Sequence, residues 1–184
     1  MRALILVERG VQDEEFIYPY YRMLEAGWKV EVATPNGTDV HGKFGVPVRA
    51  TCTILRALKL ATENDVILIP GGFECPDRLR SMLTVQTIVR DHFYAGKLIA
   101  AICHGPWVLI SAGIVKGKNM AGYESIADDL KNAGAIYSDA AVVTDGNIIT
   151  ADHYRSLGPF MKTVIEWRKE PAWGLELCGA AARP

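Results

Sequence analysis

The segment Ala101-Ile102-Cys103-His104-Gly105 holds the side chains of this sequence that are best suited to covalent chemistry. It joins an apolar run at 97–102, which predicts a strand, to a helical pattern at 107–112. A nucleophile between small neighbours, directly after a strand and before a helix, has the layout of a nucleophile elbow. Such a turn lifts the thiol above the sheet, where the N-terminal amides of the helix favour thiolate over thiol. A buried, inert cysteine is the alternative, since free cysteines are commonly buried.

Two further segments offer groups that a cysteine nucleophile needs. In Pro70-Gly71-Gly72 the glycines let backbone amides approach a ligand closely, so the amides of Gly72 and His104 could together hold an oxyanion. Glu15, near the start of a helical pattern, would raise the thiol pKa as a carboxylate and lower it as a protonated hydrogen-bond donor. A plain turn and a solvated acid at a helix start are the simpler explanations of these residues.

Short apolar runs alternate with longer helical patterns along the chain. Continuous apolar strands between helices predict an α/β three-layer sandwich with a mostly parallel, doubly wound sheet. The ligand site of such a fold lies at the carboxyl ends of the strands, which directs attention to segments 8–15, 70–77 and 103–106. Strands are predicted at 2–7, 29–34, 65–69 and 97–102, and helices at 78–94, 107–112, 125–133 and 156–168.

Several segments depart from this regular alternation. Pro19 within the first helical pattern predicts a kink or a late helix start. The segment 43–53 contains Pro47 and is expected to be an edge excursion, whereas Asp145-Gly146 predicts a tight hairpin within 142–150. We interpret residues 1–170 as one domain and residues 171–184, which include Cys178, as an irregular C-terminal tail.

Composition excludes several classes of protein. The 184 residues are 49% hydrophobic and 22% charged, a balance that excludes a mainly disordered chain. Lys and Arg number 20 and Asp and Glu 21, so the net charge of −1 does not favour nucleic acid as a partner. No apolar run approaches the roughly 20 residues that span a membrane, and the run at 3–7 is too short for a signal peptide. A cytoplasmic location is therefore expected.

The sequence does not predict a bound metal or cofactor. The four cysteines, at 52, 75, 103 and 178, include no Cys-x-x-Cys spacing, so a zinc ribbon or thioredoxin motif is not supported and reduced thiols are expected. A nucleotide site would need a glycine-rich phosphate loop after the first strand. Residues 8–15 instead carry several carboxylates, which would repel phosphate.

Several motifs together resemble the PfpI-like intracellular cysteine peptidase and glyoxalase or deglycase family of the ThiJ/PfpI superfamily. The resemblance runs from Arg2 to about Arg168 and implies a flavodoxin-like sandwich, often assembled as a homo-oligomer such as a dimer or hexamer. The motifs are Asp13-Glu14-Glu15 with Tyr18-Pro19, Pro70-Gly71-Gly72, Ala101 to Pro106, and Asp128-Asp129-Leu130-Lys131-Asn132-Ala133-Gly134.

The resemblance also implies roles for individual residues. Cys103 would be the nucleophile, Glu15 its carboxyl partner, and His104 a base that is commonly oriented by an acidic residue of a neighbouring subunit. Asp77 occupies that acidic position, where the family usually has Glu, so its side chain reaches one methylene less far toward His104. Tyr123 falls where the family places a site-lining residue.

The stretch that usually borders the nucleophile departs from the family pattern. Where relatives read Thr-Ser-Arg-x-Pro, this chain has Thr150-Ala151-Asp152-His153-Tyr154, and Gln12 replaces a usual acid. An acid in place of arginine weakens anion binding there. His153 is either a second base or a polar loop residue, and the loop role is the simpler of the two.

The resemblance implies three classes of function. The first is a cofactor-free enzyme in which Cys103 adds to a small reactive carbonyl compound and His104 or Glu15 moves a proton. The second is a cysteine peptidase, amidase or hydratase, for which the sequence shows no peptide groove. The third is a redox-sensing stress protein or chaperone, which would have no need of a base at His104.

Overall fold

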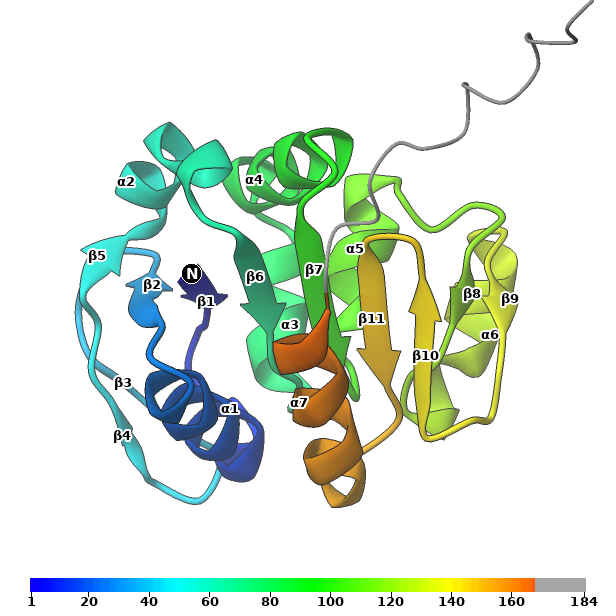
Figure 1. Cartoon of the computed structure of the whole chain (residues 1–184), viewed down its shortest axis with the longest axis horizontal. Coiled ribbons are helices and arrows are strands. Elements are labelled where there is room, and N and C mark those ends of the chain that lie inside the picture. Colours follow the sequence, from blue (N-terminus) through cyan, green and yellow to red (C-terminus); the bar gives the residue numbers. More distant parts are fainter. Residues whose placement is uncertain (168–184) are drawn as a thin grey trace, which may run out of the picture.

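The computed structural model describes residues 1–167 and contains one central sheet of seven strands. Their order across the sheet is β10-β11-β7-β6-β1-β2-β5 (Figure 1). All neighbouring strands pair in parallel except the hairpin of β10 and β11. The strands are β1 (Arg2–Leu6), β2 (Lys29–Thr34), β5 (Cys52–Thr53), β6 (Val66–Ile69), β7 (Leu98–Ile102), β10 (Val142–Asp145) and β11 (Ile148–Ala151).

Helices cover both faces of this sheet, which makes the predicted three-layer sandwich. The helices α1 and α7 pack against each other in front of the sheet (Figure 1). On the opposite face α4 packs against α2, α3 and α5. The helices are α1 (Asp13–Glu25), α2 (Ile54–Lys59), α3 (Glu74–Arg80), α4 (Leu83–Tyr94), α5 (Pro106–Ala112), α6 (Ala127–Asn132) and α7 (Leu157–Glu166), with short 3-10 turns at 61–63, 124–126 and 154–156.

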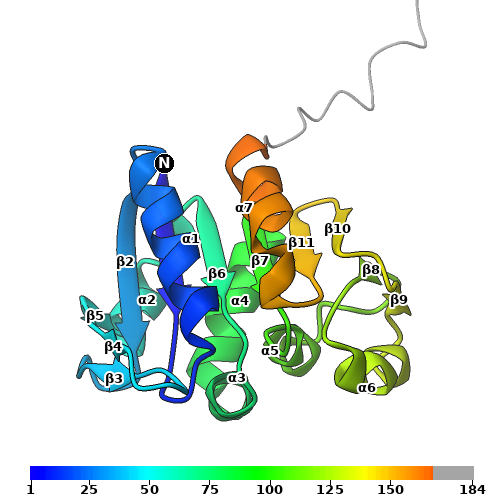
Figure 2. The same ribbon diagram turned by 90° about the horizontal axis from the view of Figure 1, so that it is seen from below.

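Two small ladders lie outside the main sheet. One joins β3 (Val40–His41) to β4 (Pro47–Val48), and the other joins β8 (Asn119–Met120) to β9 (Ile136–Tyr137). Together with α6, the β8–β9 ladder lies beyond the β10 edge of the sheet (Figure 2). This unit carries the loop at 121–126 that borders the candidate site.

The central strands are apolar on both faces because helices cover both. Every residue of β6 and β7 is buried, as are the last four residues of β1. Burial of such side chains is worth about 1.5–3 kcal/mol each, so this core holds the strand ends in a fixed relation. The loops after β1, β6 and β7 therefore meet at one edge, where the amide of Gln12 donates to the carbonyl of Gly71 at 3.3 Å.

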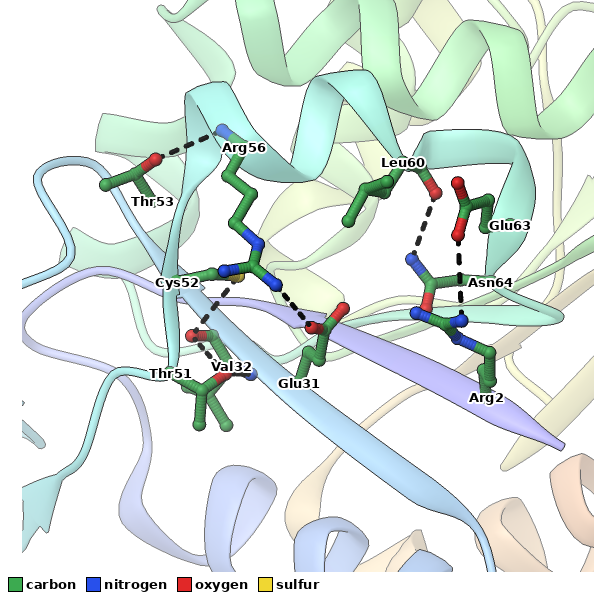
Figure 3. Close-up of polar contacts among 10 residues, drawn as sticks. All are labelled: Arg2, Glu31, Val32, Thr51, Cys52, Thr53, Arg56, Leu60, Glu63 and Asn64. Carbon is green, nitrogen blue, oxygen red and sulfur yellow. Dashed lines mark hydrogen bonds and ion pairs between the residues drawn. The ribbon is translucent and has the colours of Figure 1, made fainter.

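The edge strand β5 is fixed by a set of polar contacts. The Thr51 hydroxyl accepts the backbone N–H of Val32 at 2.8 Å (Figure 3). The Thr53 hydroxyl caps α2 by accepting the N–H of Arg56, whose guanidinium lies 3.9 Å from the Glu31 carboxylate. These contacts explain why so short a strand can end the sheet.

Some local predictions are wrong. Residues 78–94 form no single helix, because Met82 is extended between α3 and α4 and the side chains of Ser81 and Gln86 bind the carbonyls of Arg78 and Arg80. The first helix does not start late: α1 begins at Asp13 and includes Pro19. The segment 43–53 does lie at the edge as predicted, since it contains β4 and the edge strand β5.

Other local predictions are confirmed or lie outside the structure. The hairpin at Asp145-Gly146 is present, with Val142 opposite Ala151. No helix within residues 1–167 has the length and apolar character that a membrane crossing requires. The predicted tail at 171–184, with Cys178, lies outside the described residues.

Candidate functional site

Cys103 sits on a sharp turn directly after β7. Its φ of 60° is the only positive value of a non-glycine residue within 1–167, a conformation that an L-residue adopts at a cost. The turn also explains Gly105, because a Cβ there would lie 2.5 Å from the carbonyl oxygen of Ile69. The strand, strained cysteine, glycine and following α5 confirm the predicted nucleophile elbow.

The Cys103 sulfur is surrounded by three polar groups. The Glu15 carboxyl forms a hydrogen bond with it, and the backbone N–H groups of Gly72 and His104 are directed at it. One oxygen of Glu15, Oε2, also accepts the N–H of Gly71 at 2.7 Å. Cys103 is 7% exposed, so its sulfur lies at the rim of the core with polar partners around it.

Glycine is required at position 71 because the site is so closely packed. A Cβ there would lie 2.5 Å from Glu15 Oε2 and 2.7 Å from the Cys103 Cβ. The predicted Pro-Gly-Gly turn therefore serves as the close approach that the sequence suggested, and not as a plain turn.

Glu15 is buried, so the solvated acid considered from the sequence is wrong. Its side chain is fully enclosed, and this burial raises its pKa to about 7, against the opposing effect of the Gly71 amide. Its Oε1 oxygen is buried without a hydrogen-bond partner among the described groups. A carboxyl group with this pKa can hold or release a proton near neutral pH.

The amides at the elbow act on the Cys103 thiol in the predicted direction, but other groups outweigh them. Burial raises the pKa of the thiol, and a charged Glu15 raises it further, although the amides of Gly72 and His104 oppose both effects. When the proton resides on Glu15, the repulsion disappears and the carboxyl can donate to the sulfur. Formation of the Cys103 thiolate therefore depends on whether Glu15 carries a proton.

His104 lies beside the sulfur. Its Nδ1 is 3.3 Å from Cys103 Sγ, and its Nε2 is 3.2 Å from the Ser125 hydroxyl. Burial lowers the pKa of His104 and the positive charge of Lys43 lowers it further, whereas Asp129 acts in the opposite direction. A neutral imidazole in contact with a thiol has the geometry of a general base.

A row of aromatic rings continues from His104. Tyr123 stacks on His104 with ring centroids 5.2 Å apart, and His153 stacks on the far side of Tyr123 at 5.5 Å. The Tyr123 amide also donates to the Cys103 carbonyl at 2.9 Å. Nδ1 of His153 accepts the N–H of Arg155 at 3.3 Å, so His153 shapes its loop and lies one ring away from His104.

The row borders a cleft of about 430 Å³. Asp152, which stands where relatives are expected to have arginine, lies in this cleft, and its Oδ1 is buried without a hydrogen-bond partner in the described chain. The cleft is lined by Gly122, Tyr123, Glu124, Tyr137, Asp139, Asp152, His153 and Arg155.

Asp77 is not brought to His104 within one chain. It is exposed on α3 and lines a separate cleft of about 600 Å³, and no hydrogen bond or ion pair joins it to His104 in the described residues. Arg80, which lines the same cleft, stacks on Trp107 at 5.4 Å, and the Trp107 ring meets His104 at 4.8 Å.

Two residues that act on His104, Ser125 and Lys43, are not predicted from the sequence. Ser125 follows Tyr123 in a 3-10 turn, a loop position with no recognisable pattern. Lys43 is held by its own amide, which donates to the Val11 carbonyl at 2.8 Å, and by buried Asp13, whose carboxylate accepts the amides of Phe44 and Val46. Within residues 1–167 no group of three or more histidine, cysteine or acidic side chains is arranged to hold a metal ion.

Comparison with known proteins finds a family model and relatives that match most of the chain. The family model described as DJ-1/PfpI family matches residues 1–167. The deglycase PH1704 of Pyrococcus horikoshii is 38% identical over 166 residues, which cover 88% of this chain and 98% of that protein. The protein/nucleic acid deglycase 2 of Escherichia coli is 38% identical over 147 residues, covering 78% of this chain and 83% of that protein.

Solved structures share the fold. A two-domain protein of Anabaena variabilis, with DJ-1/ThiJ/PfpI-like and ferritin-like domains, superposes with a TM-score of 0.85 at 38% identity. The match covers 89% of this chain and 46% of that longer chain. With its cysteine elbow, its parallel sheet and these relatives, the chain belongs to the DJ-1/PfpI family.

Proposed function

We propose that this chain is a cysteine enzyme of the glyoxalase or deglycase type, which acts on small reactive carbonyl compounds with its own side chains and no cofactor. One observation supports the proposal above all: a strained cysteine at the rim of the core contacts both a buried carboxyl group with a pKa of about 7 and a neutral imidazole. Such a set provides a nucleophile and two proton carriers. The names of two deglycase relatives favour the same chemistry.

The proposed reaction converts an α-ketoaldehyde and water to a hydroxy acid. Cys103 loses its proton to His104, and its sulfur adds to the aldehyde carbon, whose π electrons move to oxygen. That oxygen takes the proton back from His104 to give a neutral hemithioacetal and a neutral imidazole. Glu15 or His104 then removes the proton from that carbon, and the neighbouring ketone oxygen takes up a proton to form an enediol. Tautomerisation gives a thioester, which water hydrolyses to release the acid and the thiol. No external oxidant or reductant is needed.

The polar groups around the sulfur fit these steps. The amides of Gly72 and His104 are directed at Sγ, where they stabilise negative charge on the sulfur and, after addition, on an oxygen bound next to it. Asp152 in the adjoining cleft favours neutral or cationic carbonyl compounds over anionic ones, because it places negative charge where an arginine would attract a carboxylate.

The test is the formation of lactate from methylglyoxal, measured beside the hydrolysis of a fluorogenic peptide. Lactate is the right readout because loss of methylglyoxal alone would also count reversible adducts. The wild type should form lactate, and Cys103→Ala and His104→Ala should not. Peptide hydrolysis without lactate would support a peptidase instead. No turnover of either substrate, with partner binding that changes on oxidation of Cys103, would support a redox sensor.

A further inference from the structure

The Ser125 hydroxyl contacts the one ring nitrogen of His104 that faces away from the sulfur. Its Oγ is 3.2 Å from Nε2, whereas Nδ1 is 3.3 Å from Cys103 Sγ. A neutral imidazole has one N–H donor and one acceptor, and the partner of one nitrogen therefore sets the role of the other. Ser125 can thus determine whether Nδ1 is free to accept the thiol proton.

Two tautomers are compatible with these distances, but only one supports proton transfer. If Nε2 carries the proton, it donates to the Ser125 oxygen, and Nδ1 is left as an acceptor for the thiol proton of Cys103. If Nδ1 carries the proton, it cannot take another from the sulfur. After transfer, the imidazolium donates from both nitrogens, and the Ser125 oxygen still accepts from Nε2. A hydroxyl oxygen is therefore a suitable partner both before and after the step.

The surrounding groups leave this role to Ser125. Asp77, the residue expected to orient His104, forms no hydrogen bond or ion pair with it among residues 1–167 and lines a separate cleft. Asp129 accepts the indole N–H of Trp107 at 2.8 Å and acts on His104 only through its charge. Lys43 opposes protonation of the ring by its charge, and Tyr123 and Trp107 fix the ring plane without binding a nitrogen.

We propose that Ser125 is a positioning residue, whose hydroxyl accepts the Nε2 proton of His104 and so keeps Nδ1 available to the Cys103 thiol. A residue of the same chain then orients His104, whereas the family is expected to use an acidic residue of a neighbouring subunit for this. This inference rests on the proposed function for its kinetic part, but the tautomer of His104 can be observed without any substrate.

The direct test is ¹⁵N NMR of the histidine side chains at about pH 8, where His104 is neutral. His104→Gln identifies the His104 signal among the four histidines of the chain. The wild type should show the Nε2–H tautomer, Ser125→Ala a mixture shifted toward Nδ1–H, and Ser125→Thr the wild-type state. Thr163→Ala, which removes an exposed hydroxyl on α7, is the matched control and should change nothing.

The kinetic test uses the same variants. Ser125→Ala should lower kcat for lactate formation by about tenfold with little change in KM and should shift the acid limb of the pH profile, and Ser125→Thr should restore both. A wild-type Nδ1–H tautomer, or a tautomer that responds to Asp77→Asn and not to Ser125→Ala, would overturn the inference. If Ser125→Ala shifts the tautomer of His104 but the wild type forms no lactate, the inference stands and the proposed function is rejected.

Discussion

The Glu15 carboxyl and the Cys103 thiol share a hydrogen bond in a site where both are buried. A charged Glu15 raises the pKa of Cys103, whereas the hydrogen bond from the neutral thiol lowers the pKa of Glu15. The two therefore titrate as a coupled pair, and the proton that remains determines whether a thiolate can form. His104 gives this pair a third site for the proton.

Substitution of Glu15 should change how the reactivity of Cys103 depends on pH. Below about pH 7 Glu15 is protonated and donates to the sulfur, whereas above it the carboxylate repels the thiolate. In Glu15→Gln no such charge forms, so iodoacetamide should modify Cys103 faster than in the wild type above pH 7, by about tenfold. Peptide mapping isolates the rate at Cys103. Buried Cys75 should stay unmodified and serves as the control. Identical pH profiles of the Cys103 modification rate in the wild type and in Glu15→Gln would contradict the coupling.

The same substitution should change the pH dependence of stability. The pKa of Glu15 is raised from 4.5 to about 7 in the folded protein, so the folded chain binds more protons than the unfolded chain between these values. The stability that protonated Glu15 contributes is fully present below pH 4.5 and is lost as the pH rises toward 7. The free energy of unfolding of the wild type, relative to Glu15→Gln, should fall across this range by on the order of 3 kcal/mol. Urea denaturation at several pH values measures the free energy of unfolding of both proteins. A difference between them that does not change with pH would reject a raised pKa for Glu15.

The second glycine of the Pro-Gly-Gly turn, Gly72, should tolerate no side chain. Gly72 has φ of 81°, and a Cβ there would lie 2.5 Å from the Gly10 carbonyl oxygen and 2.6 Å from the Gln12 nitrogen. Gly72→Ala should cost a few kcal/mol of stability and lower kcat/KM more than tenfold, because the amide directed at the sulfur must move.

Gly27→Ala is the matched control for this prediction. Gly27 has a similar φ of 76° but nothing within 4 Å of an added Cβ, so only the backbone cost of about 1–2 kcal/mol should appear. Urea denaturation and lactate formation give the two readouts. Equal effects of the two variants on activity would show that the close approach at Gly72 is unimportant.

Much of the site could be predicted from the sequence because its members follow strand ends. Cys103, Gly71 and Gly72 come directly after two apolar strands, and parallel strands bring their carboxyl ends to one edge. Glu15 could be named as a candidate, but its burial could not, since an acid in the first turn of a helix usually faces solvent.

The remaining contacts depend on tertiary packing and leave no local pattern. Ser125 meets His104 only because the loop before α6 folds over the elbow, and Lys43 is placed by a buried Asp13 thirty-odd residues away. The break between α3 and α4 was missed because side chains of Ser81 and Gln86, and not a glycine or proline, end the helix there. The position of Asp77 relative to any second subunit also lies beyond local sequence patterns.

Asp152 should make the cleft beside Tyr123 and His153 discriminate against anions. Pyruvate and its neutral amide, pyruvamide, have similar size and differ in charge, so their inhibition constants against methylglyoxal turnover isolate this effect. The wild type should bind pyruvamide more tightly. Asp152→Asn should narrow the difference by about threefold to tenfold, and Asp152→Arg should reverse it.

The control for charge alone is Glu25→Gln, at the exposed end of α1 and outside the cleft lining. It makes the same change in net charge and should leave the ratio of the two inhibition constants unaltered. An equal change of this ratio in Asp152→Asn and Glu25→Gln would show that the net charge of the protein, and not Asp152, sets the preference for pyruvamide over pyruvate.

The most direct test of the account is lactate formation from methylglyoxal by the wild type and by Cys103→Ala, with Cys75→Ala as the matched cysteine control. Loss of the nucleophile should lower kcat/KM by about a thousandfold or more while the folded structure is retained. Denaturing mass spectrometry of the wild type during turnover should find the added mass of the substrate on Cys103 alone. Full turnover by Cys103→Ala would contradict covalent catalysis at this sulfur.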